Sequence, residues 1–71
     1  MPYAALSDLP PAVRRMPVHA QEIFRAAFNA AWEAHALDHP ARREEAAFRI
    51  ARAAVKRRYR KVGEDWMDRG G

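Results

Sequence analysis

Seven basic side chains and no acidic one occur between Ala46 and Gly63, in a chain whose formal net charge is only +4. They are Arg49, Arg52, Lys56, Arg57, Arg58, Arg60 and Lys61. A block of one charge favours polyanionic partners, namely nucleic acid, anionic lipid or an acidic protein face. The competing interpretation is a merely solvated helix face, because an outward face is charged in any case and arginine is a good helix former.

The spacing of these basic residues matters as much as their number. At about 100° per residue in a helix, Arg49, Arg52, Lys56 and Arg60 project from one side, opposite the apolar residues. Such a stripe can contact phosphates with an affinity that falls steeply with salt and carries little sequence information. The predicted polyanion-binding or partner-binding residues are therefore Arg49, Arg52, Lys56, Arg57, Arg60 and Lys61.

Two aromatic residues, Phe48 and Tyr59, flank this stripe on the helical wheel. Exposed aromatic rings beside arginines can stack on bases or anchor a protein partner. In a small domain such rings more often complete the core. We expect Tyr59 to lie in the core, and the sequence leaves both roles open for Phe48.

Three histidines raise the question of a metal site. His35 and His39 lie four residues apart with Asp38 between them, but Pro40 disfavours helical geometry at His39, so the two rings are not expected on one face. Hard cations need several oxygen ligands, and the acids nearby are few. We expect no metal site, and we expect His19 to cap or brace a helix, with contact to a partner as the alternative.

No arrangement of residues predicts catalysis. The chain has no cysteine, and no serine stands with a base and an orienting acid. A glycine-rich phosphate loop is also lacking. We therefore expect a protein that is not an enzyme, with no cofactor and no small-molecule substrate.

With 71 residues, the chain is expected to form one domain that is small for a self-sufficient core. No window approaches the roughly 20 apolar residues of a membrane-spanning helix, and no secretory signal opens the chain. These features predict a cytoplasmic protein that is peripheral to a membrane at most. Its basic surface disfavours self-association, so we expect a monomer.

Apolar periodicity and proline positions predict a mainly all-α fold, with one short and two long helices. The expected ranges are 10–15, 18–36 and 40–61. Leu9, Val13 and Met16 are the predicted core residues of the first region. In the second helix the predicted buried residues are Ala20, Ile23, Phe24, Ala27, Phe28, Ala31 and Ala34, and in the third they are Ala47, Ile50, Ala51, Ala54 and Val55. Glu22, Arg25, Asn29 and Glu33 are expected on the opposite face of the second helix.

The C-terminal segment contains Trp66 and Met67, which are too apolar for a free tail. Gly63 is expected to end the third helix. We expect residues 64–67 to pack near residues 3–6, as a two-stranded antiparallel pair of the terminal segments. Residues 68–71 are expected to fray.

Several separated motifs identify a family resemblance. Met1-Pro2-Tyr3 leads into Ser7-Asp8-Leu9-Pro10, His19-Ala20-Gln21-Glu22-Ile23-Phe24 leads into Ala27-Phe28-Asn29-Ala30-Ala31-Trp32, and Ala53-Ala54-Val55-Lys56 precedes Tyr59 and Trp66. In this order and at this spacing, the motifs resemble the ChaB family of small bacterial proteins, commonly labelled cation transport regulators. The resemblance covers nearly the whole chain.

The resemblance implies a compact helical domain with a small strand pairing near the termini. It also implies a regulator of cation transport that acts through macromolecular contact, with a cation antiporter as the protein partner. The alternative function, supported by charge alone, is nucleic-acid binding through the basic face of the third helix.

Overall fold

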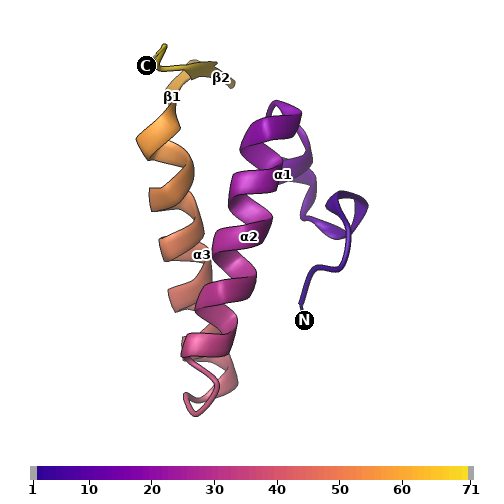
Figure 1. Cartoon of the computed structure of the whole chain (residues 1–71), viewed down its shortest axis with the longest axis vertical. Helices are drawn as coiled ribbons and strands as arrows, with labels where there is room; N and C mark the ends of the chain where they lie inside the picture. The colour runs from indigo at the N-terminus through magenta and orange to yellow at the C-terminus, as the bar shows by residue number, and fades with distance from the viewer. Residues whose placement is uncertain (1, 71) are drawn as a thin grey trace.

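Two long helices, α2 (Val18–Ala34) and α3 (Pro40–Arg58), run antiparallel and form the main body of the molecule (Figure 1). The structure is a computed structural model that describes residues 2–70. The 3-10 turn η1 (Leu6–Asp8) and the short helix α1 (Pro11–Arg14) precede α2, and the strands β1 (Tyr59–Val62) and β2 (Asp65–Asp68) follow α3. The predicted mainly α-helical fold, with one short and two long helices and a small strand pair, is confirmed.

The two long helices start at the predicted residues and end earlier than predicted. Both follow a proline signal: Pro17 is the N-cap of α2, and Pro40 is the first residue of α3. Helix α2 ends at Ala34 rather than Ala36, and α3 ends at Arg58 rather than Lys61. The early end of α3 is due to Tyr59, whose backbone is extended (φ −123°, ψ 153°) and whose side chain is buried.

The strands form a C-terminal hairpin in which Tyr59 faces Asp68 and Lys61 faces Trp66. Gly63 has a φ of +62° and lies in the two-residue connection between the strands. A positive φ at the first loop position but not at the second is the pattern of a type II′ turn, which suits the twist of a hairpin. Gly63 therefore reverses the chain inside the hairpin, and the prediction that it ends the third helix is wrong, because α3 already ends at Arg58.

The predicted pairing of residues 64–67 with residues 3–6 is wrong, because β2 pairs with β1 and the N-terminal segment is held by α2. Asn29 donates to the Tyr3 carbonyl at 2.9 Å and accepts from the Tyr3 amide at 3.3 Å. The guanidinium of Arg25 donates to the carbonyl of Ala4 at 3.2 Å. The Tyr3 ring packs on Phe28 with 4.8 Å between centroids.

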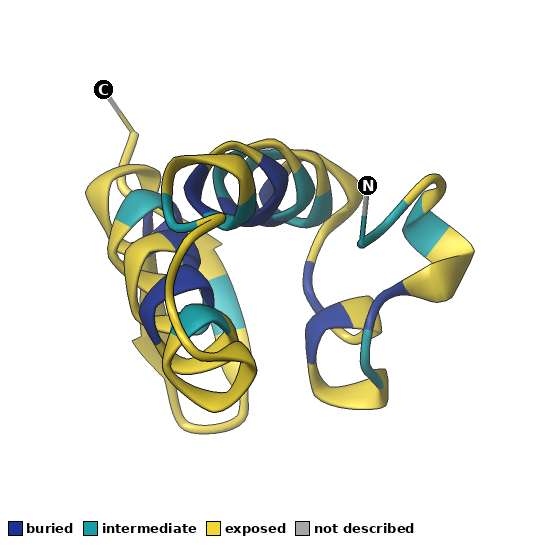
Figure 2. Ribbon diagram, turned by 90° about the horizontal axis from the view of Figure 1, so that it is seen from below, coloured by how far each residue is buried: buried dark blue, intermediate teal, exposed yellow. Residues whose placement is uncertain are grey.

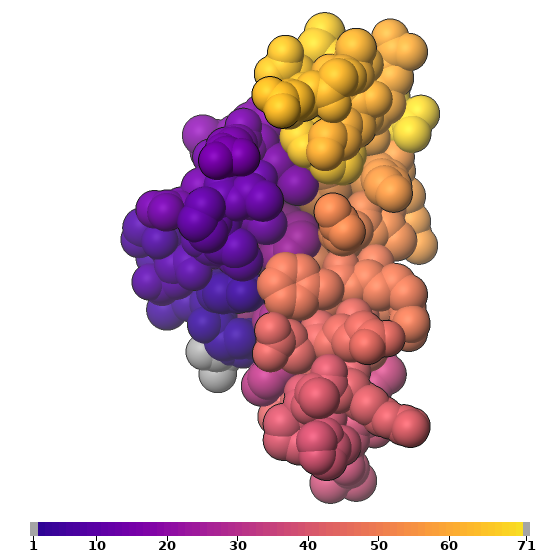
Figure 3. Space-filling model, turned by 180° about the vertical axis from the view of Figure 1, so that it is seen from behind, coloured from indigo at the N-terminus to yellow at the C-terminus, as the bar shows by residue number. Residues whose placement is uncertain are grey.

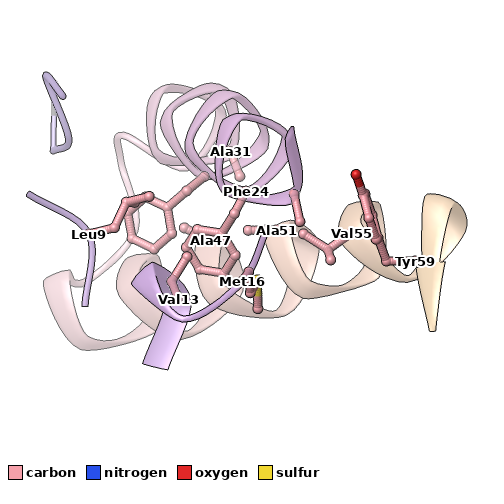
Figure 4. Close-up of a cluster of buried hydrophobic side chains, with 11 residues drawn as sticks. Leu9, Val13, Met16, Phe24, Ala31, Ala47, Ala51, Val55 and Tyr59 are labelled. Carbon is pink, nitrogen blue, oxygen red and sulfur yellow. The ribbon is translucent and has the colours of Figure 1, made fainter. Parts of the chain in front are cut away.

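The core lies where α1, η1 and their flanking residues meet one face of α2 and α3 packs beside them (Figures 2 and 4). Leu9, Val13 and Met16 are buried as predicted. From α2 come Ala20, Phe24, Phe28 and Ala31, and from the third helix and the first strand come Ala47, Ala51, Val55 and Tyr59. The alanines let α2 and α3 approach closely, since helix separation depends on the side chains at the contact.

The predicted burial or exposure of three residues is wrong, and in each case the reason is which other segments cover that part of the helix. Ile50 is 39% exposed, because it lies about 100° around the helix from Ala51, at the margin of the face that α2 covers. Ala34 is exposed at the last residue of α2. Asn29 is 9% exposed rather than solvated, because the N-terminal segment crosses its side of α2.

Asp68 and Arg69, which fall in the predicted frayed end, are hydrogen-bonded. The Arg69 amide donates to the Arg58 carbonyl at 2.8 Å, and its side-chain Nε donates to the Lys56 carbonyl at 2.7 Å. The Gly70 amide donates to the Asp68 carboxylate at 2.7 Å. Gly71, the last residue of that predicted end, and Met1 lie outside the described residues.

Candidate partner-binding surface

The outward face of α3 carries Arg49, Arg52 and Lys56, all exposed. Within residues 2–70, the basic side chains within 4.0 Å of a carboxylate are His35, beside Asp38, and Arg58, beside Asp68, so none of these three cations is paired with a carboxylate. Figure 3 shows α3, in coral and orange, as a long exposed side of the molecule next to the N-terminal segment in indigo. The charge on this face is therefore available to a partner.

A shallow groove of about 570 Å³ runs along the same face, and every residue that lines it belongs to α3. The lining residues are Glu45, Phe48, Arg49, Arg52, Ala53 and Lys56. The eleven residue steps from Glu45 to Lys56 correspond to about 16 Å along a helix. The groove combines an apolar floor at Phe48 and Ala53 with three cations and one acid.

Phe48 lies at the boundary between the core and the surface, and its role towards a partner stays a prediction. Its ring packs edge-on against Phe28 with 5.0 Å between centroids and lies 5.8 Å from Phe24. Its side chain is half-buried and also lines the groove. The floor of the groove is therefore held in place by the core and cannot rotate away freely.

Tyr59 lies in the core, as predicted, and is 5% exposed. Its hydroxyl lies 3.2 Å from Nδ1 of His19, which stands in the first turn of α2. The pair connects the start of α2 to the end of α3. This is the bracing role expected for His19, whose side chain nevertheless remains exposed enough to reach a partner.

The other predicted basic residues do not continue the stripe along the helix. Arg57 is exposed on α3 but does not line the groove. Arg60 and Lys61 lie on β1, because α3 ends at Arg58. In the hairpin Arg60 faces Met67, and Lys61 places its Nζ 5.9 Å from the Trp66 ring. The predicted stripe is thus divided between a helical part, which ends at Lys56, and a hairpin part.

Arg58 is exposed and its charge is partly offset, since its Nε lies 3.4 Å from the Asp68 carboxylate. The pKa of Asp68 is lowered, first by the Gly70 amide that donates to its carboxylate and further by Arg58. Burial raises the pKa of the Tyr3 hydroxyl, and the negative charge of Glu44 adds to this effect. Neither group lines the groove on α3.

The histidines at the turn between α2 and α3 make local contacts. His35 lies 2.8 Å from Asp38, and Nδ1 of His39 accepts from the Ala41 amide at 3.3 Å. In the described part of the chain, no group of three or more His, Cys, Asp or Glu side chains is placed to hold a metal ion. The same region contains a cation–π contact, in which the guanidinium of Arg43 lies 4.0 Å from the centre of the Trp32 ring. Nε of Arg43 also donates a hydrogen bond to the Trp32 carbonyl at 2.7 Å.

Sequence reasoning found the cations of the surface and missed the groove. Glu45 and Ala53 were not among the predicted site residues, although the spacing of Glu45, Phe48 or Arg49, Arg52 and Lys56 is that of one helix face. The sequence therefore contains the spacing of the groove residues. It does not indicate which side of the helix the other elements leave uncovered.

No helix among residues 2–70 has the length and apolar character needed to cross a bilayer.

The comparisons with known proteins point in one direction. The family model ChaB matches residues 9–69. The proteins named "Putative cation transport regulator ChaB" from Escherichia coli (strain K12) and Shigella flexneri are each 44% identical to this chain over 70 residues, covering 92% of both sequences. The "NMR solution structure of the putative cation transport regulator ChaB" superposes with a TM-score of 0.86 at 40% identity and covers 97% of this chain and 100% of that one.

The family match, the identity and the shared fold agree with the motifs that run from the N-terminal segment to the hairpin, and the chain belongs to the ChaB family.

Proposed function

We propose that the chain is a non-enzymatic binding module that regulates cation transport by docking on an acidic surface of a protein partner. The relatives' printed names supply the process, because they describe cation transport regulators. A cation antiporter is the partner that fits this process best. The observation that carries the mode of action is the unpaired cationic face of α3 beside the half-buried ring of Phe48.

This combination favours a protein partner for a physical reason. Protein interfaces gain affinity from an apolar anchor inside a polar rim. Phe48 supplies an anchor that the core already orders, so little side-chain entropy is lost on binding. Arg49, Arg52 and Lys56 supply the rim and attract an acidic surface, which raises the association rate.

The test measures cation flux in everted membrane vesicles from the organism that encodes the chain, prepared without its gene. Purified protein should change the flux, and Arg49→Ala with Arg52→Ala should weaken that change. The matched control is Arg14→Ala with Arg15→Ala, which removes the same charge from an exposed position at α1. If the flux does not respond to the protein, or if both double variants behave alike, the proposal is wrong.

The second candidate function is nucleic-acid binding. It is favoured by one observation, namely that six of the seven basic residues between Ala46 and Gly63 have no carboxylate partner within residues 2–70. The test is a titration of labelled DNA and RNA at about 50 and about 200 mM salt, between which phosphate binding loses orders of magnitude in affinity. If binding is undetectable at the lower salt, or if alanine at Arg49, Arg52, Lys56 and Arg60 leaves it unchanged, this candidate is excluded.

A further inference from the structure

We propose that the groove on α3 takes an acidic amphipathic helix of the partner protein. This proposal rests on the proposed function, since it names the kind of segment that would dock on the cationic face. Its subject is a single surface, lined by Glu45, Phe48, Arg49, Arg52, Ala53 and Lys56.

The shape of the groove suits a helix. It follows one face of α3 over about three helical turns, or about 16 Å. A second helix packed alongside would bury a stripe of its own residues at three-residue and four-residue spacing. Ala53 is the small residue in the lining, so it marks the place where a partner's side chain can approach the backbone of α3.

The charges of the groove specify the occupant's chemistry. Three cations stand beside the apolar floor, and they complement glutamate or aspartate on the flanks of an apolar stripe. A purely charged ligand would leave Phe48 and Ala53 without a partner. An occupant with both an apolar stripe and acidic flanks contacts the apolar floor and all three cations of the groove.

Glu45 makes the charge of the groove differ between its two ends. It lies one turn before Arg49 at the N-terminal end of the groove and has no ion-pair partner in the described part of the chain. A carboxylate there repels an acidic residue and attracts a basic one, so it disfavours an occupant that is acidic along its whole length. It disfavours a nucleic-acid backbone for the same reason.

The experiment uses the full chain and a labelled synthetic peptide of about 16 residues, long enough for about four helical turns. The peptide carries leucines on one face, glutamates on the flanks and one lysine near one end as the partner of Glu45. A second peptide of identical composition has these residues shuffled so that no face forms. Fluorescence anisotropy should show tighter binding of the amphipathic peptide by about tenfold or more, since the apolar stripe adds contacts that charge alone does not.

Two matched pairs of variants locate the binding. Arg52→Ala should weaken binding by about fivefold or more, whereas Arg57→Ala, which removes the same charge from the same helix outside the groove, should change it by less than about twofold. Ala53→Arg fills the groove but adds positive charge, so it should weaken the amphipathic peptide by about tenfold and leave DNA binding, if any, equal or stronger. Ala30→Arg makes the same change on the exposed side of α2 and should have little effect. Thermal unfolding of each variant checks that the fold is retained.

Several results would overturn the proposal. They are equal binding of the shuffled peptide, undetectable binding of both peptides, equal effects of Arg52→Ala and Arg57→Ala, or unchanged binding after Ala53→Arg. If the peptide experiments fail but the vesicle flux still depends on Arg49 and Arg52, the proposed function stands and the groove takes a different kind of partner segment. Peptide binding with no response of the flux supports the groove and contradicts the role in transport.

Discussion

Asn29 has a larger structural role than its position on the helical wheel suggests. Its side-chain amide nitrogen donates to the Tyr3 carbonyl at 2.9 Å, and its amide oxygen accepts from the Tyr3 backbone amide at 3.3 Å. The side chain is buried. Replacement by alanine leaves the Tyr3 amide without its partner and the Tyr3 carbonyl with only the longer hydrogen bond from Arg25, at 3.4 Å. The N-terminal segment would then be held by Arg25 and by the packing of the Tyr3 ring on Phe28.

We therefore predict that Asn29→Ala lowers the free energy of unfolding by about 1–3 kcal/mol. Urea unfolding followed by circular dichroism measures the loss. The control is Glu22→Ala, which changes an exposed residue of the same helix. An unchanged midpoint for Asn29→Ala would show that the N-terminal segment is not fixed by this contact.

The hairpin depends on the backbone of Gly63. No atom lies within 4 Å of a side-chain Cβ built at this position, so sterics with the rest of the fold do not oppose a substitution, but the φ of +62° does. Gly63→Ala should destabilise the hairpin by about 1–2 kcal/mol, while Gly63→Asn should cost less, because asparagine tolerates this region better. Hydrogen exchange of the β1 and β2 amides checks the order. Equal protection in both variants would argue against the assigned turn.

The same element should respond to acid through Asp68. The folded pKa of this group lies below its ordinary value, because of the Gly70 amide and then Arg58, so its ionised form stabilises the hairpin. That contribution is fully present above the unfolded pKa of about 4 and is lost as the pH falls through the folded value. Asp68→Asn should thus reduce hairpin protection at about pH 7 and have little effect at about pH 2. Asp65→Asn is the control, and a pH-independent effect of Asp68→Asn would contradict the prediction.

At the scale of the whole molecule, stability rests on a few rings among many alanines. Phe28 is 2% exposed and packs against Tyr3, Phe24, Trp32 and Phe48. It therefore links the N-terminal segment, α2 and α3. The ring of Phe48 leans on it, so the floor of the groove depends on the same residue.

We predict that Phe28→Ala costs about 3–5 kcal/mol, which is a large part of the total stability of about 4–11 kcal/mol that corresponds to about 0.05–0.15 kcal/mol per residue. The midpoint of thermal unfolding, followed by circular dichroism, should fall far below that of the wild type. Val18→Ala, at a position 63% exposed, should change stability by less than about 0.5 kcal/mol. A cooperative transition close to that of the wild type in Phe28→Ala would show that the core does not depend on this ring.

The sequence by itself determined the helical content, the proline-marked starts of α2 and α3, most of the core and the cationic face of α3. These features follow from local rules, namely apolar periodicity, the geometry of proline and the spacing of charges along a helix. The family motifs added the class of protein. The core positions of Leu9, Val13 and Met16 and the burial of Tyr59 were predicted correctly for the same reason.

Only the tertiary structure decided how the segments meet. Gly63 suits a helix end or a hairpin turn equally well by local rules, and the burial of Tyr59 selects the hairpin. Asn29 is buried and Ile50 is exposed, the reverse of the prediction, because burial depends on which segments cross each helix face. The groove beside Phe48 exists because α2 and the N-terminal segment cover only part of α3, a choice made by long-range packing that no short window of sequence contains.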